Sequence, residues 1–184
     1  MGGKVALVTG AAGEIGAATV GLLAERGSRI VAIDCDCRRV EARGRGAHGI
    51  RRDVTREDDV AAYAPNDGPG SLHIFFNNAG IEGDVAAIPD YPLEAFRRVL
   101  DVNVVGVFLG MKYVIPVMTG QDAGSIINTA SIAGLIGSSH IVVHSASKNA
   151  VIGLTKSATL ECANTQVRVG IDRQPHAVVD HRWP

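Results

Sequence analysis

Short apolar runs of strand length alternate with helix-like segments along most of this 184-residue chain. Such an alternation favours a parallel β-sheet whose strands are joined by right-handed helical crossovers. The sequence therefore predicts an α/β fold, a doubly wound parallel sheet of about six strands with helices on both faces. The expected strands are 4–9, 29–33, 48–52, 72–76, 124–130 and 166–170, and the expected helices are 14–26, 38–43, 56–63, 92–119 and 140–163.

Size and composition fit one domain with a buried core. A chain of 184 residues is long enough for one substantial core, and its 46% hydrophobic content and 22 glycines suit a buried parallel sheet with tight turns. No internal repeat or low-complexity linker is present, so we expect a single domain over residues 1–170. Residues 171–184 show no amphipathic period and are predicted to form an irregular tail.

Charge and cysteine content argue against several classes of function. A formal net charge of −1 gives no electrostatic basis for binding nucleic acid. The apolar runs have strand length, so no membrane span is expected, and the first strand begins too early to leave room for a signal peptide. Three cysteines without a disulfide pattern fit a reducing cytoplasm, and Cys35-x-Cys37 has too few ligands for a metal site, so no metal is expected.

A glycine-rich turn follows the first predicted strand. It reads Gly10-Ala-Ala-Gly13-Glu14-Ile15-Gly16 and leads into an alanine-rich helix. Glycines at such a turn let the backbone approach a pyrophosphate, whose charge is stabilised at the helix N-terminus. An ordinary strand–turn–helix is the alternative, but the position at the start of a βαβ unit favours nucleotide binding. These five named residues are therefore candidates for binding a dinucleotide.

The second predicted strand ends in Asp34. An acidic residue about twenty positions after the glycine turn can accept hydrogen bonds from the adenosine ribose hydroxyls. Its charge would repel a 2′-phosphate, which favours NAD over NADP. A solvated aspartate at the end of a strand is the alternative interpretation.

Two later segments carry further motifs. The block IFFNNAG ends at Gly80, and residues 126–161 read IINTASIAGLIGSSHIVVHSASKNAVIGLTKSATLE. Together with the glycine turn, these segments resemble the short-chain dehydrogenase/reductase family over about residues 4–169. The turn resembles the family's T-G-x-x-x-G-x-G, with Glu14 at the middle glycine, and Gly13 makes it a tolerated variant. The resemblance implies a Rossmann-like fold and an NAD-dependent oxidoreductase acting on a secondary alcohol or ketone.

The resemblance also assigns roles to individual residues. In the family, a serine steadies the substrate oxygen, a tyrosine transfers the proton, and a lysine lowers the tyrosine pKa and holds the nicotinamide ribose. Ser131 and Lys148 match the serine and the lysine, and Asn103 resembles the helical asparagine that positions a water for the proton relay. Residues that resemble the remaining cofactor contacts are Asp53, Val54, Asn78, Ala79 and Gly80. Asp53 could equally cap the helix that starts near residue 55.

His144 occupies the position of the family's catalytic tyrosine, four residues before Lys148. Residues at i and i+4 share one face of a helix, so both side chains are expected in one cleft. An imidazole is shorter than a phenol by roughly 2–3 Å, and about 1 Å of misplacement can cost on the order of a hundredfold in rate. The lysine charge favours the neutral imidazole, yet a neutral imidazole can still carry protons. A weakened oxidoreductase and a catalytically inactive dinucleotide-binding protein are both left open.

The ends and surfaces of the chain suggest two further expectations. In the family, long helices matching 92–119 and 140–163 pack across a subunit interface, so a homodimer or homotetramer is expected, and a dimerising interaction protein is a third alternative. The family continues beyond position 170 with a substrate-covering helix pair and a seventh strand, which 171–184 does not resemble. The seventh strand is therefore expected to be missing, and the substrate cannot be narrowed beyond its class.

Overall fold

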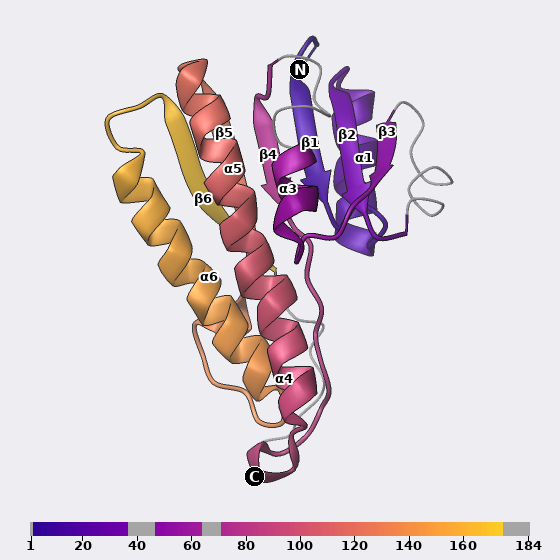
Figure 1. The fold of residues 1–184 in the computed structure, drawn as a ribbon, viewed down its shortest axis with the longest axis vertical. Coiled ribbons are helices and arrows are strands. Elements are labelled where there is room, and N and C mark those ends of the chain that lie inside the picture. The colour runs from indigo at the N-terminus through magenta and orange to yellow at the C-terminus, as the bar shows by residue number, and fades with distance from the viewer. Residues whose placement is uncertain (1, 37–46, 64–70, 175–184) are drawn as a thin grey trace.

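One parallel sheet organises the protein (Figure 1). The structure, a computed structural model, describes residues 2–36, 47–63 and 71–174. Six strands pair in parallel in the order β3-β2-β1-β4-β5-β6. They are β1 Val5–Thr9, β2 Arg29–Asp34, β3 Ala47–Arg51, β4 Ile74–Asn77, β5 Gly124–Ser131 and β6 Val167–Gln174. The strand order reverses between β1 and β4, so the predicted doubly wound α/β fold is confirmed.

The helices agree closely with the expected segments. They are α1 Glu14–Glu25, α3 Glu57–Tyr63, α4 Leu93–Leu100, α5 Gly106–Gly120 and α6 Val142–Glu161. Short 3-10 helices occur at η1 Ile88–Asp90 and η3 Ile132–Gly134, and a π-helical turn, η2 Asp101–Val105, joins α4 to α5. The predicted helix 38–43 lies outside the described residues.

The sheet separates two cores of different character. Successive side chains of a strand point to opposite faces. In β1, Leu7 therefore contributes to the larger core under α3, α5 and α6, whereas Val8 contributes to the smaller core under α1. The larger core holds bulky side chains such as Phe75 and Met118, but the smaller one contains several alanines, including Ala6 and Ala32. The α1 face thus buries less apolar volume than the opposite face.

The helix formed by α4, η2 and α5 runs unbroken over Leu93–Gly120 and is long and apolar enough to cross a membrane by length and composition alone. The sequence predicted this helix at 92–119 but no segment able to span a membrane, because the prediction assigned strand length to the apolar runs. Its apolar side chains have another explanation, since Val107, Val114 and others lie in the larger core against the sheet. Packing in the larger core therefore accounts for the buried side of this helix.

Buried amides connect the middle of the sheet to two helices. Asn77 Nδ2, at the end of β4, donates to Asn128 Oδ1 on β5 at 3.0 Å and to the Val107 carbonyl of α5 at 3.0 Å. Asn128 Nδ2 in turn donates to Thr155 Oγ1 on α6 at 2.9 Å. Because both asparagines are buried, these bonds satisfy amide groups that would otherwise destabilise the core.

The last strand is longer than expected. β6 pairs with β5 through Gln174, opposite Ser131, whereas the sequence predicted that the strand ends at 170 and an irregular tail begins at 171. That boundary was wrong, because the parallel ladder with β5 continues for four residues beyond Gly170. The rest of the predicted tail, 175–184, lies outside the described residues.

Candidate active site

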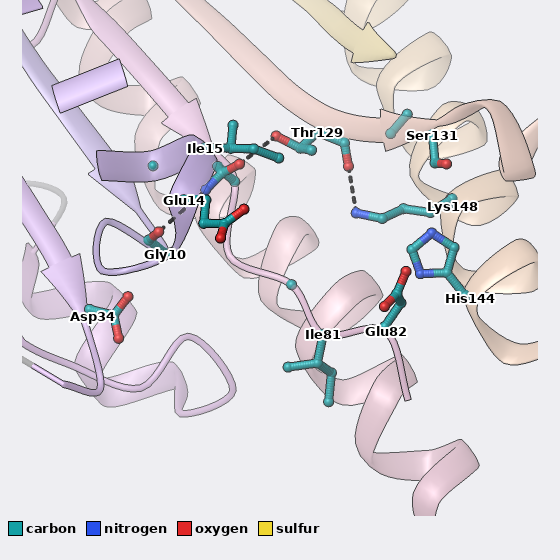
Figure 2. A pocket seen from close by; sticks show the side chains of 15 residues that line it. Gly10, Glu14, Ile15, Asp34, Ile81, Glu82, Thr129, Ser131, His144 and Lys148 are labelled. Atoms are coloured by element: carbon teal, nitrogen blue, oxygen red, sulfur yellow. Dashed lines mark hydrogen bonds between the residues drawn. The ribbon is translucent and has the colours of Figure 1, made fainter. Parts of the chain in front are cut away.

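A cleft opens at the carboxyl ends of the central strands (Figure 2). It has a volume of about 660 Å³ and lies beside β1 and β4, where the strand order reverses. Open α/β sheets bind ligands at such a switch point. The predicted site residues that line the cleft are Gly10, Gly13, Glu14, Ile15, Gly16, Asp34, Asn78, Gly80, Ser131, His144 and Lys148.

The glycine turn that forms one wall is packed too closely for side chains. Gly10 has a left-handed φ of +66°, and a Cβ there would lie 2.8 Å from the Cα of Ala79. A Cβ on Gly16 would collide with the carbonyl oxygen of Gly10. Gly13 precedes α1 as its N-cap residue and has an ordinary extended conformation. Gly10 and Gly16 therefore form the tight strand-to-helix turn that a pyrophosphate requires.

Glu14 is the first residue of α1, and its exposed carboxylate projects into the cleft (Figure 2). An acidic side chain is favourable at a helix N-terminus, where the backbone N–H groups carry partial positive charge. The same position is where the pyrophosphate of a dinucleotide would be stabilised. Glu14 thus places a fixed negative charge next to the expected phosphates.

Asp34 lies at the end of β2, between the cleft and an adjoining cavity. Its Oδ2 accepts a hydrogen bond from the Ala12 backbone N–H at 2.9 Å, and its Oδ1 accepts from the Asp36 N–H at 3.0 Å. Both bonds fix the carboxylate at the edge of the glycine turn. Its predicted role in binding the adenosine ribose stays a prediction.

The adjoining cavity, of about 650 Å³, brings in the remaining predicted cofactor contacts, Asp53, Val54 and Ala79. Asp53 Oδ1 accepts hydrogen bonds from the backbone N–H and the hydroxyl of Thr55, at 2.9 and 2.8 Å. The carboxylate therefore caps the turn before α3, as the alternative interpretation expected. Its neighbour Val54 lines the cavity at the same time, so the capping and binding interpretations are compatible.

The segment after β4 is fixed to the end of β1. Thr9 Oγ1 accepts hydrogen bonds from the backbone N–H groups of Asn78 and Ala79, at 2.9 and 3.1 Å. Asn78 Nδ2 donates to the Thr9 carbonyl at 3.1 Å. A Cβ on Gly80 would lie 3.3 Å from Asn103 Oδ1, so this segment closely approaches the η2 turn. These contacts fix the segment after β4 relative to the end of β1 and to the η2 turn.

The three residues matched to the family's catalytic group meet at the other end of the cleft (Figure 2). Ser131 ends β5 and is buried, with its Oγ accepting a hydrogen bond from the Ala133 N–H at 3.1 Å. His144 and Lys148 lie one turn apart on α6, and both are buried. The i, i+4 prediction that both side chains face one cleft is consistent with this geometry.

Burial lowers the pKa of Lys148 to about 8. Its Nζ donates a hydrogen bond to the Thr129 carbonyl at 2.8 Å, which directs the ammonium toward the middle of the cleft. At pH 7 the side chain is still mainly cationic, and raising the pH through 8 removes the charge. Because the folded state binds this proton less tightly than the unfolded chain, the free energy of unfolding should rise with pH above about 8.

Asn103 lies in the η2 turn, fully buried behind the cleft wall. Its Nδ2 donates to the Ile81 carbonyl at 2.8 Å and to Ser147 Oγ at 3.0 Å, and its Oδ1 accepts from the Ile81 N–H at 2.8 Å. The side chain therefore positions the segment after β4 and the wall of α6. Its predicted role in holding a water stays a prediction.

Four residues that line the cleft were missed by the sequence analysis: Ile81, Glu82, Thr129 and Ala130. Thr129 and Ala130 directly precede Ser131 at the end of β5. Glu82 and Ile81 follow the IFFNNAG block directly and line the cleft opposite α6. The signal available was their place just after a recognisable motif, but a single acidic residue in a loop carries no pattern of its own.

Comparison with known proteins gives consistent results. The sequence profile of the short chain dehydrogenase family matches residues 4–172. A cyclohexanol dehydrogenase of Acinetobacter sp. (strain SE19) is 40% identical over 176 residues, which cover 90% of this chain and 70% of that protein. A cis-4-hydroxycyclohexanecarboxylate dehydrogenase of Sinomonas cyclohexanicum is 38% identical, with 90% and 70% coverage.

Solved structures resemble the fold equally well. An NAD+-bound xylitol dehydrogenase superimposes with a TM-score of 0.88 at 38% identity, covering 95% of this chain and 71% of that one. A levodione reductase gives a TM-score of 0.91 at 29% identity, with 95% and 72% coverage. In each comparison the relative extends beyond the matched part.

Proposed function

Because this chain belongs to the short-chain dehydrogenase family, we propose that it is an NAD(H)-dependent oxidoreductase that transfers hydride between nicotinamide and a secondary alcohol or ketone. The observation that carries the proposal is the convergence of Ser131, His144 and Lys148 in the same cleft as the glycine turn. One end of the cleft is thereby suited to a pyrophosphate, and the other end offers groups for proton transfer.

The glycine turn supports the choice of a dinucleotide cofactor. Gly10 and Gly16 leave no room for a Cβ, which fits a backbone that must approach phosphate oxygens. Asp34 supports NAD over NADP, because its carboxylate would repel a 2′-phosphate. The similar xylitol dehydrogenase structure was solved with NAD+ bound.

The residues of this chain suggest the following chemistry for alcohol oxidation. NAD+, held by the glycine turn, would supply the acceptor for the hydride that leaves the carbinol carbon. His144 takes the hydroxyl proton at an imidazole nitrogen, while Ser131 Oγ donates a hydrogen bond to the substrate oxygen. Lys148 Nζ would hold the nicotinamide ribose hydroxyls and add positive charge near the reacting oxygen. In the reduction of a ketone, the same groups work in reverse.

The substrate is proposed from the relatives. Two of them are named for dehydrogenation of a ring-borne hydroxyl, in cyclohexanol and in cis-4-hydroxycyclohexanecarboxylate. We therefore propose an alicyclic secondary alcohol as the first substrate class to test. We also propose a cytoplasmic homodimer or homotetramer that uses the helix Leu93–Gly120 together with α6, since Phe108 on this helix is exposed.

A second candidate function is that of a catalytically inactive NAD-binding protein. The specific observation in its favour is His144 at the proton-transfer position, where a shorter side chain must reach the substrate. Both candidates require the same cofactor, so turnover separates them and binding does not.

The experiment that tests the proposal is a fluorescence titration of the purified chain with NADH and with NADPH, followed by an assay with cyclohexanol and NAD+. We expect NADH to bind at least about tenfold more tightly than NADPH, because of the Asp34 charge. In the Asp34→Ser variant this preference should largely disappear. Binding without turnover would favour the inactive protein, and no binding of either nucleotide would contradict both candidates.

The Glu14 carboxylate leads to a separate prediction about affinity. We expect Glu14→Gly to tighten NADH binding by about tenfold, or about 1.4 kcal/mol, because removing the charge relieves its repulsion of the pyrophosphate. Glu14→Gln should give most of the gain, since it removes the charge and keeps the size. Isothermal titration calorimetry measures both.

Glu25, at the opposite end of α1, provides the matched control. Glu25→Gln changes the net charge equally but should leave the dissociation constant of NADH unchanged. Equal affinities of wild type, Glu14→Gln and Glu14→Gly would show that the carboxylate does not oppose the phosphates.

A further inference from the structure

The segment between Ile81 and Ala86 lies across the start of α6. At its beginning, Ile81 exchanges two hydrogen bonds of 2.8 Å with the Asn103 side chain. At its end, the Ala86 N–H donates to the His140 carbonyl at 2.9 Å, and Ala86 forms a parallel bridge with Ile141. Both ends are therefore fixed to elements that border the cleft.

The middle of this segment is equally constrained. Gly83 has a left-handed φ of +83°, and a Cβ there would lie 2.7 Å from Val99 Cγ2 and 3.2 Å from Val143 Cγ1. The turn thus presses against the residue directly before His144. These contacts of its neighbours place the backbone of Glu82 at the edge of the cleft, opposite α6.

Figure 2 shows the outcome of these constraints. The Glu82 carboxylate points toward the His144 imidazole, and both residues line the same cleft. Lys148, which lies on α6 with His144, extends instead toward Thr129 and donates to its carbonyl at 2.8 Å. His144 is only 6% exposed, whereas Glu82 is exposed to solvent. The carboxylate therefore lies on the solvent side of the buried imidazole.

We propose that Glu82 is a positioning residue for His144, so that a carboxylate–imidazole pair carries out proton transfer in place of the tyrosine, while Lys148 is retained. The carboxylate accepts a hydrogen bond from one imidazole nitrogen, which fixes the tautomer and aims the other nitrogen at the substrate oxygen beside Ser131. When the imidazole takes the hydroxyl proton, the carboxylate stabilises the resulting cation. After the product has left, the substrate-side nitrogen releases its proton to water, which restores the starting tautomer. The inference rests on the proposed function.

The charges around His144 decide what removing the carboxylate should do. Glu82 faces the imidazole from the segment after β4, Lys148 lies one turn on along α6, and Glu14 lies on the opposite wall of the cleft. His140 precedes the helix, and Ser131 is neutral. A carboxylate favours the protonated imidazole and an ammonium disfavours it. Glu82→Gln should therefore make the imidazole lose its proton at lower pH.

The first test needs no turnover. The imidazole C–H resonances of the full-length protein are followed by NMR as a function of pH, and His144→Gln identifies which of the six histidines gives the signal. We expect Glu82→Gln to lower the titration midpoint of His144 by about one pH unit. Asp84→Asn, an exposed acid in the same segment, is the matched control and should leave the midpoint in place. An unchanged midpoint in Glu82→Gln would overturn the pair.

The second test uses kinetics. Glu82→Gln should lower kcat for alcohol oxidation by about ten- to a hundredfold and leave the NADH dissociation constant unchanged. In a His144→Tyr background, where no imidazole needs orienting, the same substitution should change kcat less than about threefold. Equal losses in the two backgrounds would overturn the positioning role. If Glu82→Gln shifts the His144 midpoint but the wild-type protein shows no turnover, the proposed function is contradicted and the Glu82–His144 pair is supported.

Discussion

Replacing His144 with tyrosine is expected to raise the rate of alcohol oxidation about a hundredfold. A phenol is longer than an imidazole by roughly 2–3 Å, and a reacting group misplaced by about 1 Å can lose on the order of a hundredfold in rate. Lys148 lies one turn away on the same face of α6, where its cation would lower the pKa of the new phenol and favour proton transfer. The measurement is kcat and kcat/KM with cyclohexanol and NAD+, for both proteins.

His48→Tyr serves as the control, because His48 is exposed on the strand β3 at the sheet edge, away from the cleft. It should leave the rate unchanged. If His144→Tyr binds NADH normally but gains no activity, the length of the side chain at this position is not what limits the enzyme. The Glu82 pair would then have to be judged on the NMR titration alone.

The second large effect concerns stability. Asn128→Ala is expected to lower the free energy of unfolding by about 2–4 kcal/mol. The substitution removes the acceptor for Asn77 Nδ2 and the donor to Thr155 Oγ1, and leaves a cavity in the middle of the sheet. Urea denaturation followed by circular dichroism measures the change, with the m-value as a check on two-state behaviour.

Asn149 offers a matched control on α6. Its Nδ2 also donates one hydrogen bond, of 3.0 Å to the Gly134 carbonyl, but the residue is exposed. Asn149→Ala should cost less than about 1 kcal/mol, since water replaces the lost partner. If both variants lost a similar free energy of unfolding, burial of the Asn77–Asn128 pair would not increase its contribution to stability.

Much of the fold could be predicted because the strands are short apolar runs with clear limits. β1 and β2 were located to within a residue, since both are almost entirely buried, β1 is followed by Gly10 and β2 ends in the polar residue Asp34. The end of β6 could not be predicted in the same way. Residues 171–174 include charged side chains, and they belong to the strand only because β5 provides a ladder that long.

The site residues show the same contrast between local sequence patterns and contacts distant in the sequence. Gly10, Ser131 and Lys148 were found because each belongs to a motif with fixed spacing. Glu82 was not found, because its position depends on contacts made by Ile81 and Ala86 with residues distant in the sequence. Patterns locate residues that local geometry fixes, whereas an acidic residue aimed by the folding of a loop is visible only in three dimensions.

The unequal cores on the two sides of the sheet affect where the protein begins to unfold. The face under α1 is lined by small side chains such as Ala6 and Ala32, while bulky residues fill the face under α5 and α6. Less apolar area holds α1 in place, so local unfolding and backbone amide exchange should begin there rather than in α5 or α6. The glycine turn belongs to this weaker half. A dinucleotide bound to it would stabilise this half, so the free energy of unfolding would rise with the dinucleotide concentration.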